Sequence, residues 1–175
     1  MLKMNKSRDT IFAVATPTGK SALAVIRISG SQAFQAISSI SSNMPKESNV
    51  ATLNTIKDIS GELIDKTITT KYISPRSYTG EDMVELTIHG GPATISKSLK
   101  ILNEFKKLRF AEPGEFTRRA FENNKLDLTQ VEAISDLINS ETEAQRKQSL
   151  NQLNGLFSNK INLWSDKILK ILADI

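Results

Sequence analysis

Apolar and polar positions alternate along the first part of the chain, where two short runs open the pattern. The runs cover residues 10–16 and 22–29, and the segment 17–20 between them has the composition of a turn. Successive side chains of a β-strand point to opposite faces. One face of the second run is apolar and is made by Ala22, Ala24, Ile26 and Ile28. Arg27 falls on the opposite face, so we predict two strands, the second of which carries a charge.

Three further strands and two helices are predicted before residue 108. The strands lie near residues 51–56, 67–73 and 83–89, and the helices cover residues 31–40 and 92–107. Ser29 or Ser31 is expected to cap the first helix. Residues 38–49 and 74–81 have the composition of loops. This order predicts an α+β fold, in which helices pack on a mixed or antiparallel sheet.

Helical signals replace the strand signals after Pro113. Two segments fit the capping-box pattern and predict helix starts, Thr129-Gln-Val-Glu132 and Ser140-Glu-Thr-Glu143. The second predicted helix carries an apolar seam at steps of three and four, formed by Leu150, Leu153, Phe157, Ile161, Trp164, Ile168 and Ile171. Such a seam must be covered, either by helices beyond this chain or by a second copy. We therefore predict an N-terminal domain over residues 1–120 and long helices of a truncated helical domain over residues 121–175.

Composition excludes several classes of protein. The 175 residues are 39% apolar and 24% charged, which is ordinary for a globular chain. The absence of cysteine excludes disulfides and thiolate metal sites, and a single histidine excludes a histidine-rich metal site. No apolar run reaches the ~20 residues that a membrane span needs. We expect a cytoplasmic protein without a membrane partner, whose formal charge of +4 suits an anionic ligand only weakly.

Charged and aromatic residues in or beside the predicted strands are the candidate site residues. A strand charge is costly to bury unless it is paired or binds something, so Arg27 and Glu85 either form a salt bridge, face solvent or contact a ligand. Lys125 follows a short helix, where a solvated lysine is favoured by the helix dipole. Tyr78 and Gly80 precede the strand of Glu85. Tyr78 is expected either to stack on an aromatic ligand or to fill the core.

No catalytic residue and no metal site are predicted. Gly19-Lys20-Ser21 lacks the glycine that a phosphate-binding P-loop needs five residues before Gly19, where this chain has Val14. The His89-Gly-Gly-Pro92 turn lacks the nucleophilic serine motif that would make it an oxyanion hole. We expect His89 to be a packed or capping residue.

Three stretches closely resemble the N-terminal part of the MnmE (TrmE) family of tRNA-modification GTPases. One combines the short runs Asp9-Thr-Ile and Ala24-Val-Ile-Arg-Ile-Ser-Gly30, and the others are residues 78–91 and residues 111–128. The resemblance runs from about Asp9 to Phe157. It implies a folate-binding domain similar to that of glycine-cleavage T-proteins, followed by the opening of a helical domain. It also implies that the family's GTPase domain and its cysteine-bearing C-terminal motif are absent from this chain.

The resemblance also implies roles for the candidate residues. Arg27, Glu85 and Lys125 occupy the positions that contact a reduced folate, 5-formyltetrahydrofolate, which stands in for 5,10-methylenetetrahydrofolate. A pterin presents an N–H beside an amino group, which a carboxylate such as Glu85 can accept. The carboxylate tail suits Arg27 or Lys125, and Tyr78 and Gly80 are further candidates. One further basic residue of the family's site would lie beyond this chain.

By the same resemblance, the whole protein would modify C5 of the wobble uridine of tRNA together with the flavoprotein MnmG (GidA). This chain would bind the folate and form a homodimer through its N-terminal domain, while GTP, K⁺ and Mg²⁺ would be needed only by the full-length family. Two alternatives stay open. The chain could be a dimerisation scaffold without a complete ligand site, or a folate enzyme of the T-protein type, although residues 126–134 follow the MnmE pattern.

Overall fold

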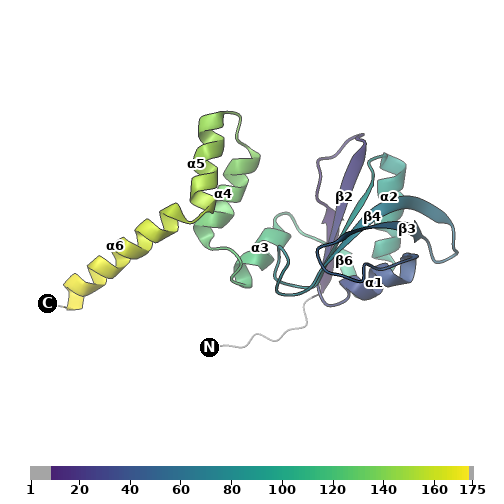
Figure 1. Cartoon of the computed structure of the whole chain (residues 1–175), viewed down its shortest axis with the longest axis horizontal. Helices are drawn as coiled ribbons and strands as arrows, with labels where there is room; N and C mark the ends of the chain where they lie inside the picture. The colour runs from purple at the N-terminus through teal and green to yellow at the C-terminus, as the bar shows by residue number, and fades with distance from the viewer. Residues whose placement is uncertain (1–8, 174–175) are drawn as a thin grey trace. The chain divides into compact units, whose positions relative to one another are not determined.

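The computed structural model describes residues 9–173, and this part of the chain divides into two compact units. The first unit ends at Phe116, and the second begins at Thr117. All strands of the described residues belong to the first unit, and the second is helical (Figure 1).

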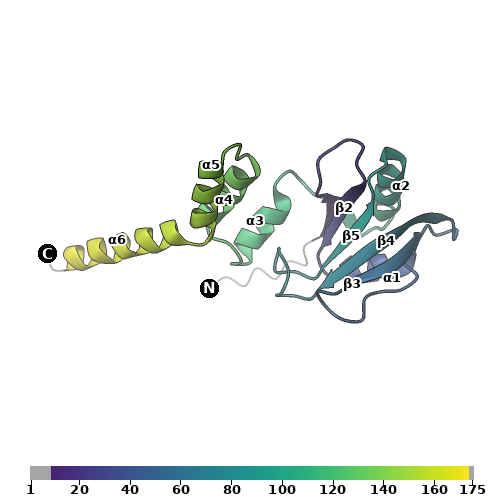
Figure 2. The ribbon, with the colours of Figure 1, turned by 45° about the horizontal axis from the view of Figure 1, so that its top comes forward.

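A six-stranded sheet organises the first unit, with the strand order β3-β4-β5-β2-β1-β6. The strands are β1 (Thr10–Val14), β2 (Leu23–Ser29), β3 (Ala51–Lys57), β4 (Leu63–Tyr72), β5 (Met83–His89) and β6 (Leu108–Phe110). Neighbouring strands run antiparallel except for β1 and β6, which are parallel. Strands β3 and β4 form a hairpin at one edge of the sheet (Figure 2). The mixed sheet and its helices confirm the predicted α+β class.

The core lies between one face of this sheet and two helices, α1 (Ala33–Ile40) and α2 (Pro92–Asn103). The predicted alternation decides which strand residues enter it, since Ala24, Ile26 and Ile28 are buried. The core cluster also contains Val84, Leu86 and Ile88 of β5, Ile37 and Ile40 of α1, and Ile101 and Leu102 of α2. Fully burying one such aliphatic side chain contributes about 1.5–3 kcal/mol. The opposite face, which carries Arg27, is therefore not part of this core.

The helix predicted over residues 92–107 is too long. Helix α2 ends at Asn103, and Leu108–Phe110 forms β6 instead. This short strand lies beside β1, with Thr10 opposite Leu108, and the ladder continues where the Ala111 N–H donates to the carbonyl of Phe12. Three residues are too few for a strand period to show in the sequence, so only the pairing with β1 reveals it.

The cap predicted for α1 is also wrong. The residue before the helix is Gln32, and its side chain makes no cap hydrogen bond. Its N–H donates instead to the hydroxyl of Thr10, at 2.9 Å. Ser29 is unavailable as a cap because its hydroxyl donates to the Glu81 carboxylate and bonds the Thr79 hydroxyl. Gln32 and Ser29 thus bond to residues distant in the sequence, and neither makes the expected cap bond.

Four helices make up the rest of the described chain: α3 (Glu115–Glu122), α4 (Leu128–Ile138), α5 (Glu143–Leu153) and α6 (Leu156–Ala173). Helices α4 and α5 lie side by side, and α6 extends away from them (Figures 1 and 2). Two reciprocal hydrogen bonds join α4 and α5. The Gln130 side-chain amide donates to the carbonyl of Leu153, and the Gln152 side-chain amide donates to the carbonyl of Thr129. None of the helices in residues 9–173 is long and apolar enough to cross a membrane.

Both predicted capping boxes are displaced by two residues. The caps are Asp127, which pairs with Gln130, and Thr142, which pairs with Gln145. In each box the capping side chain accepts from the backbone N–H three residues on, and the glutamine side chain accepts from the cap's own N–H. Ser140 instead donates to the carbonyl of Leu137 at the end of α4.

The apolar seam predicted as one continuous helix is broken. Helix α5 ends at Leu153, and Gly155 takes a positive φ of 81° before α6 begins. Glycine adopts this conformation without the cost that a Cβ imposes, which makes it a natural helix terminator. The α6 side of the seam is exposed among the described residues, at Phe157, Ile161, Trp164, Ile168 and Ile171.

Candidate functional site

Arg27 and Glu85 face each other across neighbouring strands. The register of β2 and β5 places them directly opposite one another, on the sheet face away from α1 and α2. The Arg27 Nε donates to Oε1 of Glu85 at 2.8 Å, and Nη2 lies 2.8 Å from the same oxygen. Both side chains are about one-fifth exposed, at 23% and 21%. The salt bridge expected as one alternative is therefore present, and contact of either residue with folate stays a prediction.

Tyr72 completes the surroundings of the Glu85 carboxylate. Its hydroxyl donates to Oε2 at 3.1 Å. Burial raises the pKa of the Tyr72 phenol above its ordinary 10.0, and the neighbouring charge of Glu85 raises it further. The phenol therefore stays neutral, as a hydrogen-bond donor, at physiological pH. Sequence reasoning missed Tyr72, because nothing in a strand-end tyrosine indicates which carboxylate it will meet.

Two aromatic rings hold the guanidinium of Arg27. Its central carbon lies 4.8 Å from the ring centroid of Tyr78 and 5.5 Å from that of Phe116. Cation–π contacts of this kind contribute about 0.5–1 kcal/mol at exposed sites and more where water is excluded. Tyr78 is thus brought to the predicted site, where its ring stacks on Arg27. Phe116, which sequence reasoning missed, joins it.

The loop that carries Tyr78 is fixed at several points. Gly80 has a positive φ of 78°, and its carbonyl accepts from the hydroxyl of Ser74 at 2.8 Å. Thr79 is fully buried, and its hydroxyl lies 2.7 Å from that of Ser29 at the end of β2. Gly80 therefore shapes the loop, and the buried hydroxyl pair anchors it two residues from Arg27 on the same strand.

Lys125 belongs to the second unit, unlike Arg27, Glu85 and Tyr78. The α3 helix ends in a Schellman motif: Asn124 has a positive φ of 56° and donates to the carbonyl of Phe121, while the Lys125 N–H donates to that of Ala120. The capping box of Asp127 follows two residues later. The backbone of Lys125 is thereby fixed between the end of one helix and the start of the next.

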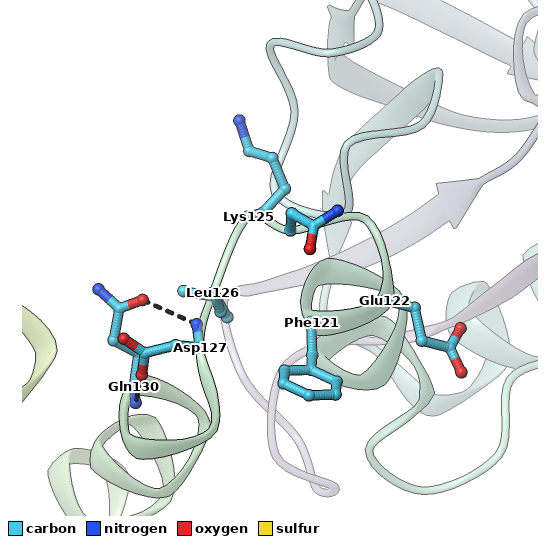
Figure 3. Close-up of a pocket in the computed structure, with 7 residues that line it drawn as sticks. Phe121, Glu122, Lys125, Leu126, Asp127 and Gln130 are labelled. Atoms are coloured by element: carbon cyan, nitrogen blue, oxygen red, sulfur yellow. Dashed lines mark hydrogen bonds between the residues drawn. The ribbon is translucent and has the colours of Figure 1, made fainter. Parts of the chain in front are cut away.

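A pocket of about 520 Å³ lies beside Lys125. It is lined by Phe121, Glu122, Asn124, Lys125, Leu126, Asp127 and Gln130. Figure 3 shows the Lys125 side chain directed away from Asp127 and Gln130, which are joined by the two bonds of the capping box. The lysine is exposed, as expected from its place after a helix.

His89 is neither packed nor a helix cap, contrary to expectation. Its side chain is 68% exposed, and Nδ1 lies 2.7 Å from Oδ1 of Asp65. The other oxygen of Asp65 accepts from the His89 backbone N–H, so this carboxylate ties β5 to β4. Within residues 9–173, no group of three or more acidic, histidine or cysteine side chains could hold a metal ion.

These features define a class of protein, in which an α+β domain with a charged cluster on its open sheet face precedes a helical segment. Residues 10–125 match the family model described as the N-terminus of the GTP-binding protein TrmE. Residues 128–175 match the model described as the MnmE helical domain. Together the two matches account for all of the chain except residues 1–9 and 126–127.

Comparison with individual proteins agrees with the family models. The tRNA modification GTPase MnmE of Dinoroseobacter shibae is 46% identical over 165 residues, which are 94% of this chain and 38% of the relative. Proteins of the same name from Rhodopseudomonas palustris and Caulobacter vibrioides are 42% and 45% identical, over 97% and 94% of this chain. The chain belongs to the MnmE (TrmE) family. It spans 38%, 38% and 36% of the length of these three relatives.

Proposed function

We propose that this chain is the folate-holding part of an MnmE-type tRNA-modification protein. It would bind a reduced folate, 5-formyl- or 5,10-methylenetetrahydrofolate, as the one-carbon donor for C5 of the tRNA wobble uridine. The observation that carries the proposal is the Glu85 carboxylate, which Arg27 holds on the open sheet face of a chain from this family.

The residues fit such a ligand. A carboxylate has about four lone-pair positions, two on each oxygen. Of the Arg27 donors, Nε makes the hydrogen bond to Oε1, and Tyr72 donates to Oε2. With one hydrogen bond on each oxygen, one lone-pair position of each remains for the paired N–H donors of a pterin edge. The bound folate would supply the one-carbon unit, and the residues of this chain would bind and orient it. Arg27 and Lys125 stay the two candidate cations for the carboxylate tail.

Calorimetric titration of this chain with 5-formyltetrahydrofolate tests the proposal. Saturable binding is expected, and Glu85→Gln should weaken it by about tenfold or more, because a charge-assisted hydrogen bond contributes about 1.5–3 kcal/mol. Glu104→Gln is the matched control, since it makes the same charge change at an exposed position after α2. Unchanged affinity in a folded Glu85→Gln chain would remove Glu85 from the site.

The whole protein's reaction and partners belong to the same proposal. We propose that the complete protein works with the flavoprotein MnmG on tRNA and hydrolyses GTP with K⁺ and Mg²⁺ through a domain outside this chain. The relatives, of whose length this chain covers 36–38%, are named tRNA modification GTPases, which supports the tRNA and GTP parts of this assignment.

A dimerisation scaffold is the second candidate, and the open sheet face supports it. Leu53 of β3 and Ile68 of β4 are paired across this face and are 77% and 44% exposed. They lie one cross-strand row from Glu85, since Ile68 faces Thr87 on β5. Light scattering tests the scaffold: a dimer that Leu53→Glu dissociates, together with absent folate binding, would favour it over the folate proposal. Folate binding by a dimer would join both roles in one domain.

A further inference from the structure

Arg27 by itself leaves the Glu85 carboxylate incompletely fixed. Nε and Nη2 both approach Oε1, at 2.8 Å, so the guanidinium does not form the two parallel bonds to two oxygens that a fork-on-fork pair makes. The terminal torsion of a glutamate is broad and only weakly restricted by its own chain. One anchored oxygen therefore leaves the plane of the carboxylate free to turn.

Tyr72 anchors the other oxygen. Its hydroxyl donates to Oε2 of Glu85 at 3.1 Å. We propose that Tyr72 is a positioning residue of the folate site, which sets the plane of the Glu85 carboxylate for the paired donors of the pterin. This inference rests on the proposed folate function and adds to it a residue that orients the acceptor without being the acceptor.

The sheet register explains why Tyr72 can reach this oxygen. Glu85 lies between Arg27 on β2 and Thr70 on β4. Tyr72 is two residues beyond Thr70, so it points to the same face and is the diagonal cross-strand neighbour of Glu85. Such neighbours are within reach of an aromatic side chain. The carboxylate on β5 is thus held from both adjacent strands, by a cation on one side and a neutral donor on the other.

The Tyr72 hydroxyl can donate a hydrogen bond at the neutral pH at which folate binding is measured. The pKa of Tyr72 is raised, first by burial and then by the charge of Glu85, so the phenol keeps its proton at neutral pH. A neutral donor adds no second positive charge beside Arg27. It therefore fixes the orientation of the carboxylate without neutralising the charge that attracts the pterin donors.

The test compares Tyr72→Phe with the unchanged chain, in calorimetric titrations of this chain with 5-formyltetrahydrofolate. Phenylalanine keeps the ring and removes only the hydroxyl. We expect an affinity loss of about tenfold, the size of one hydrogen bond to a charged group. In the Glu85→Gln background, the same substitution should cause little further loss, because Tyr72 acts through Glu85.

A tail fragment separates positioning from a general structural effect. The affinity for p-aminobenzoylglutamate, which lacks the pterin, should be the same for Tyr72→Phe and the unchanged chain. Equal losses for both ligands, equal losses with and without Glu85, or no loss at all would each overturn the role of Tyr72. Failure of the unchanged chain to bind 5-formyltetrahydrofolate would overturn the proposed function, and this inference with it.

A second measurement covers the case in which Tyr72→Phe does not fold. The phenol of Tyr72 can be titrated by its ultraviolet absorbance in a Tyr78→Phe chain, where it is the one tyrosine left of the two in the sequence. Its raised pKa should fall towards 10.0 when Glu85→Gln removes the charge. An unchanged pKa would show that the hydroxyl does not hold this carboxylate and would overturn the proposal.

Discussion

The two units of this chain are stabilised in different ways. In the first, residues far apart in sequence form a sealed core, in which Phe12, Ile26 and Leu102 are fully buried. In the second, residues close together in the sequence form the stabilising bonds, in the Schellman motif at Asn124 and the capping boxes of Asp127 and Thr142. The α6 seam stays exposed. The contrast teaches that local contacts can specify where helices begin and end without burying the apolar side chains of the same unit.

The largest expected effect comes from the same substitution made in both units. Ile26 is fully buried in the first unit, and Ile168 is 57% exposed in the second. Ile26→Ala should lower the free energy of unfolding by about 2–5 kcal/mol, through lost burial and the cavity left behind. Ile168→Ala should change it by less than about 0.5 kcal/mol. Urea unfolding followed by circular dichroism measures both, and a large loss at Ile168 would show that something covers the seam in solution.

A smaller effect is expected where α3 ends. Asn124 has a left-handed conformation, which asparagine tolerates better than most residues, costs a β-branched residue about 1–2 kcal/mol and costs glycine almost nothing. Asn124→Val should therefore destabilise the second unit by about that amount and loosen the Lys125 backbone. Amide exchange of the Lys125 N–H reports this directly. Asn124→Gly is the control, and equal protection in both variants would contradict the role assigned to the Schellman motif.

The cap of α5 should contribute about 1 kcal/mol. Thr142→Ala removes the side-chain acceptor for the N–H of Gln145, and replacing such a cap costs about 0.5–2 kcal/mol. Ser140→Ala is the comparison, since the Ser140 hydroxyl donates backward to the carbonyl of Leu137 at the end of α4. Thermal unfolding of both variants decides the matter. A greater loss at Ser140 would restore the helix start predicted from the sequence pattern.

The smallest effect concerns pH and the β3–β4 turn of the first unit. The hydroxyl of Ser60 and the ammonium of Lys97 hold the pKa of Asp58 well below its ordinary 3.8. A carboxyl with a depressed folded-state pKa contributes stability above its unfolded pKa, and this contribution is lost as the pH falls. As the pH is lowered below about 3.8, the thermal unfolding midpoint of the unchanged chain should therefore fall more than that of Asp58→Asn. Parallel curves for the two chains would show that the ion pair contributes nothing to folding.

The sequence pattern predicted the bounds of one strand well, whereas the strand predicted over 67–73 begins four residues earlier, at Leu63. The range 83–89 is confirmed as β5 because its apolar residues alternate over seven positions, whereas β6 is too short to have a period. The pattern places the cap of α4 two residues too late and that of α5 two residues too early, because Thr129 and Ser140 fit it with glutamate, while Asp127 and Thr142 use glutamine. Gly155 was a visible signal for the break between α5 and α6 that the continuous apolar period concealed.

For the candidate site, the sequence by itself determined which charged residues interrupt the apolar strands. Arg27 and Glu85 stand out because successive side chains of a strand alternate between its two faces, which is a property of the backbone. The resemblance to the family implies that both belong to one site. Only the tertiary structure decided their register, so it alone brought Tyr72 to Glu85 and Phe116 to Arg27. These contacts join residues 13 and 89 positions apart in the chain. The local sequence does not indicate which distant residues will meet, because strand pairing and loop closure decide these contacts.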